Sequence, residues 1–132
     1  MLQAYTINQD VATNDLISFS HVEAVDSSAT ALINGTEIKL NAPGIYHLTG
    51  YVNASPTADG EVGVTVLLNN SAMEQTVVTA SALADNYAAV PIDTLISVNR
   101  CCPCQGPAVV TIQYTGAAGV VNLANVVVVK VR

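Results

Sequence analysis

Charged residues are scarce in this sequence. Only 11% of the residues are Asp, Glu, Lys or Arg, whereas 51% are hydrophobic. An average globular domain has about 25% charged residues. Too little charge remains to cover the whole surface of a small monomer, so we expect part of the apolar excess to contact another subunit.

Basic residues and long apolar runs are lacking as well. The chain has four Lys and Arg against ten acids, a net charge of −6, so no basic patch can neutralise nucleic-acid phosphates. Its longest apolar run, VVVV at 126–129, is far shorter than the roughly 20 residues that span a bilayer as a helix. The first residues show no basic and apolar export signal. We therefore expect no nucleic-acid binding, no membrane insertion and no secretory leader.

Cysteine occurs in a single segment, RCCPCQG at 100–106. A structural zinc site takes four ligands, usually from two separated pairs, and neither CC nor CPC has the spacing of a redox CxxC pair. The simplest interpretation is a turn stiffened by Pro103 and Pro107. The alternative is that Cys101, Cys102 and Cys104 from several subunits meet in interchain disulfides or a shared metal site. We predict no cofactor.

Catalytic motifs are also lacking. The chain has two histidines and no nucleophile elbow, phosphate-binding glycine loop or HExxH motif. His21 and Glu23 would share one strand face, where an exposed cross-strand pair is the simpler reading than a metal site. Asp59 and Glu61 offer two carboxylates, fewer than the six to eight oxygens that calcium takes. We therefore predict no catalytic residue and no enzyme activity.

What is present is the alternation of apolar and polar residues that is typical of half-buried strands, from residue 15 almost to the end. Asn34-Gly35 between apolar runs predicts a hairpin, because both residues tolerate positive φ. No segment predicts a convincing helix, and residues 71–88 are read as strand and then loop. Residues 1–14 lack a clean period and predict an N-terminal arm, which leaves 15–132 as one domain.

The last strand, VNLANVVVVKVR, is apolar on both faces. Val127, Val129 and Val131 share one face, and Val126 and Val128 share the other. A strand of this kind is covered on both sides, and in an antiparallel protein the second cover is most simply a neighbouring subunit. On the strand near residue 50, His47 and Tyr51 lie on the polar face. They are candidate recognition residues, although ordinary outward-facing residues are equally expected there.

Several segments resemble one known superfamily: NGTEIKLNAPGIYHLTGYVNAS, GEVGVTVLLNNSAM, ISVN, AVVTIQYTG and VVNLANVVVVKVR. Their order is similar to that of the trimeric jelly-roll domains of the C1q and tumour-necrosis-factor-like (TNF-like) superfamily. The resemblance covers roughly residues 15–132. It is strongest to the bacterial and phage branch, which includes spore-surface collagen-like protein tips, phage head fibres and capsid decoration proteins.

The resemblance implies an all-β, antiparallel jelly-roll sandwich of about ten strands that packs as a homotrimer. The chain has one Phe and no Trp, so few aromatic residues are left for the threefold axis. The residues expected at the trimer interface are Phe19, Leu67, Leu95, Val126 and Val128.

The resemblance also implies a function. With no collagen-like stalk and no export signal, the expected function is a non-enzymatic decoration or head-fibre module on the surface of a phage particle, attached to a capsid lattice protein. The alternative is an extracellular or spore-surface adhesion tip that binds a protein or a glycan.

Overall fold

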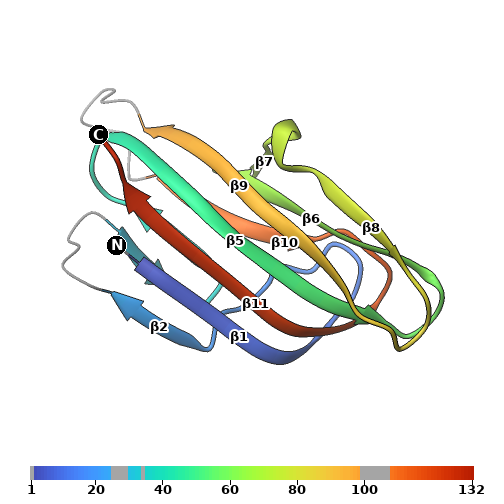
Figure 1. Cartoon of the computed structure of the whole chain (residues 1–132). Coiled ribbons are helices and arrows are strands. Elements are labelled where there is room, and N and C mark those ends of the chain that lie inside the picture. Colours follow the sequence, from blue (N-terminus) through green and yellow to red (C-terminus); the bar gives the residue numbers. More distant parts are fainter. Residues whose placement is uncertain (1, 25–29, 34, 99–107) are drawn as a thin grey trace.

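The computed structural model describes residues 2–24, 30–33, 35–98 and 108–132. The chain forms two antiparallel sheets packed face to face, with one short 3₁₀ helix, η1 (Glu74–Thr76), between strands (Figure 1). The expected all-β jelly-roll sandwich is confirmed.

The five-stranded sheet contains both ends of the chain. Its strand order is β2-β1-β11-β5-β9. The bounds are β1 (Leu2–Val11), β2 (His21–Ala24), β5 (Gly44–Pro56), β9 (Ala88–Val98) and β11 (Gly119–Lys130). The first and last long strands are therefore neighbours, with Leu2 opposite Val128.

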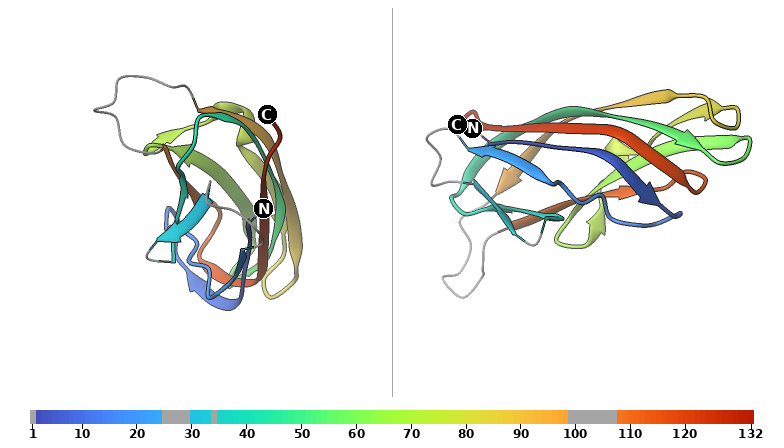
Figure 2. Two further views of the ribbon diagram at one scale, coloured as in Figure 1. Left: turned by 90° about the vertical axis from the view of Figure 1, so that its left-hand side faces the viewer. Right: turned by 90° about the horizontal axis from the view of Figure 1, so that it is seen from below.

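The six-stranded sheet has the order β3-β4-β10-β6-β7, and β8 also pairs with β6. The bounds are β3 (Thr30–Ile33), β4 (Glu37–Leu40), β6 (Gly60–Leu68), β7 (Ser71–Ala72), β8 (Val78–Ala82) and β10 (Ala108–Tyr114). Two views at right angles show the curved sheets with both termini at the same end of the sandwich (Figure 2).

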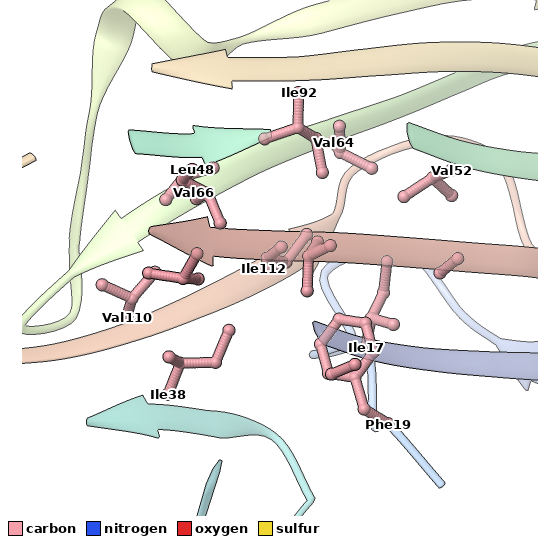
Figure 3. Close-up of a cluster of buried hydrophobic side chains, with 14 of the residues drawn as sticks. Ile17, Phe19, Ile38, Leu48, Val52, Val64, Val66, Ile92, Val110 and Ile112 are labelled. Carbon is pink, nitrogen blue, oxygen red and sulfur yellow. The ribbon is translucent and has the colours of Figure 1, made fainter. Parts of the chain in front are cut away.

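The core lies between the sheets, and strand periodicity supplies it. Along β5, β6, β9 and β10 every second residue points inward, and these residues are apolar with the exception of Thr94, as in the expected alternation. Leu48 and Val52 of β5 face Val64, Val66, Val110 and Ile112 of the other sheet across this layer (Figure 3). Ile17 and Phe19, in the segment between β1 and β2, close its lower side in the same view.

The first residues form a strand of the sheet, which corrects the expectation of an N-terminal arm. Leu2–Val11 pairs with β11 on one side and β2 on the other, and Leu2 and Ala4 are buried. Two features explain why the alternation of apolar and polar residues does not predict this strand. Thr6, a polar residue, occupies a core position, and Asn8 has φ +53° at an irregularity in the pairing with β11.

Two local predictions fall in the six-stranded sheet. The expected hairpin joins β3 and β4, where Ile33 pairs with Glu37 and Gly35 has φ +76°. Residues 71–88 form β7, η1 and β8 before the turn into β9, so this segment has more regular structure than the expected strand and loop. Within the described residues, no helix is long and apolar enough to cross a membrane.

Candidate functional site

The candidate site is the face of the five-stranded sheet that points away from the core, called here the outer face. Its side chains alternate with buried ones along each strand. The larger apolar and aromatic side chains of the outer face are Tyr5 and Ile7 on β1, Leu123, Val127 and Val129 on β11, Tyr51 on β5 and Leu95 on β9.

Strand register places these side chains in rows across the sheet. Val129 lies opposite His47, which lies opposite Leu95. Val127 lies between Gln3 and Thr49 in the next row. Leu95 and Ile7 are 60% and 52% exposed, although both are large aliphatic residues. The single chain therefore leaves large aliphatic side chains exposed on this face, between polar neighbours such as His47, Thr49 and Gln3.

The outer face carries little charge. From Gly119 to Val129, β11 has no Asp, Glu, Lys, Arg or His. The exception beside β11 is a pair between His47 Nε2 on β5 and Asp93 Oδ1 on the edge strand β9, 2.7 Å apart, whose side chains are 41% and 73% exposed. No other salt bridge is found among the residues that the structure describes.

Polar groups on this face make few hydrogen bonds. Gln3 Nε2 donates to Asn125 Oδ1 at 3.4 Å, and the rings of Tyr5 and His21 stack with centroids 4.6 Å apart. Asn53 Oδ1 is buried and accepts no hydrogen bond from any described residue. A buried acceptor of this kind is normally satisfied by water or by a partner molecule.

The structure separates the five residues expected at a subunit interface. The side chains of Phe19, Val126 and Val128 are 4%, 0% and 2% exposed within the single chain, so they cannot contact another subunit. Leu67 is half-buried on the other sheet. Leu95 alone lies on the outer face.

The prediction that Val126 and Val128 face another subunit was therefore wrong, because the opposite face of the last strand points outward. Val127 and Val129 point outward, while Val126 and Val128 fill the core. A shift in register between Val121 and Leu123 changes which residues point inward, and nothing in the local sequence marks it. The available signal was Asn125, a polar residue on the same face as Val127 and Val129.

The remaining candidates have simple placements. His47 and Tyr51 lie on the outer face as expected. Asp59 Oδ1 accepts the backbone N–H of Ala84 at 2.8 Å, so this carboxylate ties two loops together. Cys101, Cys102 and Cys104 lie outside the described residues. Within the described part of the chain, no group of three or more His, Cys, Asp or Glu could hold a metal ion.

Comparison with solved structures agrees with this architecture. The globular domain of zebrafish complement 1qA protein has a TM-score of 0.62 at 10% identity, covering 99% of this chain and 96% of that one. This chain has the C1q and TNF-like jelly-roll fold. Rabbit GITRL has a TM-score of 0.59 at 15% identity, covering 100% of this chain and 95% of that one.

The same fold occurs in a viral protein. PRD1 vertex protein P5 has a TM-score of 0.60 at 20% identity, covering 99% of this chain and 96% of that one. No family model matches the sequence, and no curated protein sequence is significantly similar to it. At such low identities the C1q and TNF-like likeness describes the fold, and function has to be argued from the outer face.

Proposed function

We propose that this chain is a non-enzymatic structural module that forms a homotrimer through the outer face and decorates the surface of a phage-type particle. One observation carries the proposal. On the outer face Leu95 is 60% exposed and Val127 and Val129 are half-buried, and the strand at its centre has no charged residue from Gly119 to Val129. Burial of such a surface against further copies of the chain removes it from water.

The outer face is large enough for a stable contact. β2 has four residues, and the other four strands have 10 to 13, so these four strands, about 4.8 Å apart, make a surface of roughly 19 by 34 Å. Specific interfaces bury roughly 800 Å² on each partner, which is similar in size. The scarcity of charge in the whole sequence also fits a chain that hides part of its surface.

The particle role is supported by two features. The fold is shared with PRD1 vertex protein P5 over almost the full length of both chains. Both termini lie at one end of the sandwich, which leaves the loops at the opposite end free to point away from an attachment site (Figure 2). Attachment to a capsid lattice protein through the terminal end would expose those loops.

The trimer is tested by light scattering on the purified protein. We expect a mass of three times the 13.6 kDa chain for wild type, and a single-chain mass for Val127→Glu combined with Val129→Glu, because six carboxylates would then meet in the contact. Thr79→Glu, on the exposed edge strand β8 of the other sheet, is the matched control and should stay trimeric. A monomeric wild type would contradict the proposal.

The particle is tested by immunogold electron microscopy with antibodies raised against the purified protein. We expect regularly spaced labels on particles released from a culture of the source. Labels on cells or spores alone would contradict the particle role and support the adhesion alternative.

The adhesion alternative has one observation in its favour. Leu83 and Tyr87 are 62% and 70% exposed in the turn between β8 and β9, at the end away from the termini. Exposed Leu and Tyr side chains on a rigid turn suit contact with a protein or a glycan. Binding of the purified trimer to a glycan array, lost in Tyr87→Ser, would support this function instead.

A further inference from the structure

The His47–Asp93 pair lies where the proposed contact would cover it. His47 on β5 is opposite Val129 on one side and Leu95 on the other, and Asp93 on β9 is opposite Thr49. The pair therefore bridges two adjacent strands diagonally, with Nε2 of His47 2.7 Å from Oδ1 of Asp93. Its surroundings on the outer face are aliphatic or uncharged.

We propose that His47 and Asp93 form a proton-binding site inside the subunit contact, so that trimer assembly takes up protons and strengthens as the pH falls. This inference rests on the proposed function. It adds that pH regulates assembly through the outer face, because the His47–Asp93 pair is buried only when a second copy covers it.

The other charged groups of the sheet lie too far away to replace either partner. Glu23 belongs to the same row as Asp93 but lies at its other end, four strand spacings or about 19 Å away. That distance exceeds the Debye length of about 8 Å at physiological salt. His21 stacks on Tyr5 at the β2 edge, and Asp10 lies opposite Val120 near the opposite end of the sheet.

Lys130, on the strand next to β5, does not neutralise Asp93 either. Lys130 lies opposite Tyr46, a core position, and its side chain extends over Gly44, so it is directed to the other face of the sheet. On β1 and β5 the remaining titratable side chains of the outer face are the phenols of Tyr5 and Tyr51. Among the described residues, protonated His47 is therefore the group that can neutralise Asp93.

The solvation of the His47–Asp93 pair differs between the free chain and a chain that is covered by a second copy. In the free chain both side chains are substantially exposed, and water screens the carboxylate whether or not the imidazole is charged. Under a second copy, a neutral His47 would leave one uncompensated carboxylate in each subunit. A protonated His47 converts this into a neutral, charge-assisted hydrogen-bonded pair. The covered state therefore binds protons more tightly than the free state.

The sign of the pH dependence follows from linkage. A state that binds more protons is favoured as the pH falls, so the contribution is complete in acid and is lost as the pH rises through the titration of the buried pair. Histidine is the side chain that ordinarily changes charge in this part of the pH scale, so assembly is compared at about pH 6 and about pH 8. With one proton per subunit, we expect the concentration for half assembly to rise at least about tenfold across that range.

The test measures the assembly midpoint by analytical ultracentrifugation at about pH 6 and about pH 8. His47→Gln and Asp93→Asn should each make the midpoint nearly independent of pH, because the first removes the group that takes up the proton and the second removes the carboxylate that the proton neutralises. His21→Gln, the other histidine of the chain, should keep the wild-type pH slope.

The outcomes separate this inference from the proposed function. A trimer whose pH slope is the same in wild type and His47→Gln would overturn the proton site and leave the trimer intact. A pH slope that His21→Gln abolishes would also overturn it. A wild type that is monomeric at both pH values would reject the proposed function and this inference together.

Discussion

The two sheets have similar inner faces but different outer faces. On the five-stranded sheet the outward side chains include Leu95, Val127 and Val129. On the six-stranded sheet the side chains on the face away from the core are mostly threonine, serine or charged: Thr79, Ser81, Glu37, Lys39 and Glu61, together with Thr65 and Thr111, which are 4% and 3% exposed. Leu67 and Val109 are the aliphatic exceptions.

This difference shows what each sheet is suited to contact. A strand face rich in Thr, Ser and charge can face water, as one face of an antiparallel sheet commonly does. The outer face of the five-stranded sheet has exposed aliphatic side chains. Apart from the His47–Asp93 pair and the charged residues of β1 and β2, it carries little charge, so it is better matched to protein than to water. The asymmetry between the sheets, more than total hydrophobicity, indicates where this chain meets a partner.

The largest effect on stability should come from a glycine in the five-stranded sheet. A Cβ at Gly50 would overlap the backbone carbonyl oxygen of Asn125 on β11 and lie 2.9 Å from the Cα of Val126. Backbone atoms of a central strand cannot move aside easily, so Gly50→Ala should lower the free energy of unfolding by about 3 kcal/mol. Urea denaturation measures it.

Its counterpart in the six-stranded sheet is Gly63. There a Cβ would meet the side chains of Thr115 and Thr79 at 2.8 and 2.9 Å and the carbonyl of Val78 at 3.1 Å. The two threonine side chains can rotate, so Gly63→Ala should cost about 1 kcal/mol. Equal costs at the two glycines would show that the sheets do not differ in how closely their backbones approach.

An intermediate effect is expected at the edge of the six-stranded sheet. Thr76 Oγ1 accepts the N–H of Val66 at 2.9 Å and donates to the carbonyl of Met73 at 2.6 Å, and the residue is buried. Thr76→Val keeps the shape but leaves a buried N–H unpaired, which should cost about 2 kcal/mol.

Thr79→Val on the adjacent exposed strand is the control for this change and should alter stability by less than about 0.5 kcal/mol. Thermal unfolding followed by circular dichroism would measure both variants. A cost for Thr76→Val no larger than that of the control would mean that water satisfies Val66 in its place.

The smallest effects are expected at two buried tyrosines, one in each sheet. Tyr46 donates its hydroxyl to the carbonyl of Ala42 at 2.6 Å, and Tyr114 donates to that of Ala117, also at 2.6 Å. Tyr46→Phe and Tyr114→Phe should each cost about 1 kcal/mol at neutral pH, as measured by urea denaturation.

The same tyrosines predict how stability changes in alkali. Burial raises the pKa of both phenols above the usual value of 10.0. The folded state therefore holds these protons more tightly, and this stabilisation is complete below pH 10.0 and is lost as the pH rises through the raised pKa values. Above pH 10.0 the melting temperature should fall less steeply with rising pH in the two Phe variants than in wild type. Identical slopes would contradict a role for these phenols.

Much of the fold could be predicted from local pattern. The alternation of apolar and polar residues predicted strands with one buried face, and the structure buries the apolar members of this alternation, among them Leu48, Val52, Val64, Val66 and Ile112. The placement of His47 and Tyr51 on the opposite face followed from the same period. These predictions needed only neighbours in sequence.

The part of the site that sequence could not give depends on long-range pairing. Val126 and Val128 were assigned to the interface, although the irregularity near Leu123 turns them into the core. The contact between Asp93 and His47 depends on the pairing of β9 with β5, two strands that are far apart in the sequence.

The sequence by itself determined an all-β sandwich, because a period of two, repeated along the chain, is compatible only with strands that have one buried face. It also determined that some apolar surface would remain, because the chain has too few charges to cover it. In a strand that is apolar on both faces, such as β11, alternation does not say which face points inward. The tertiary structure decided that by pairing residues as far apart as Leu2 and Val128, since only the second sheet defines an inside.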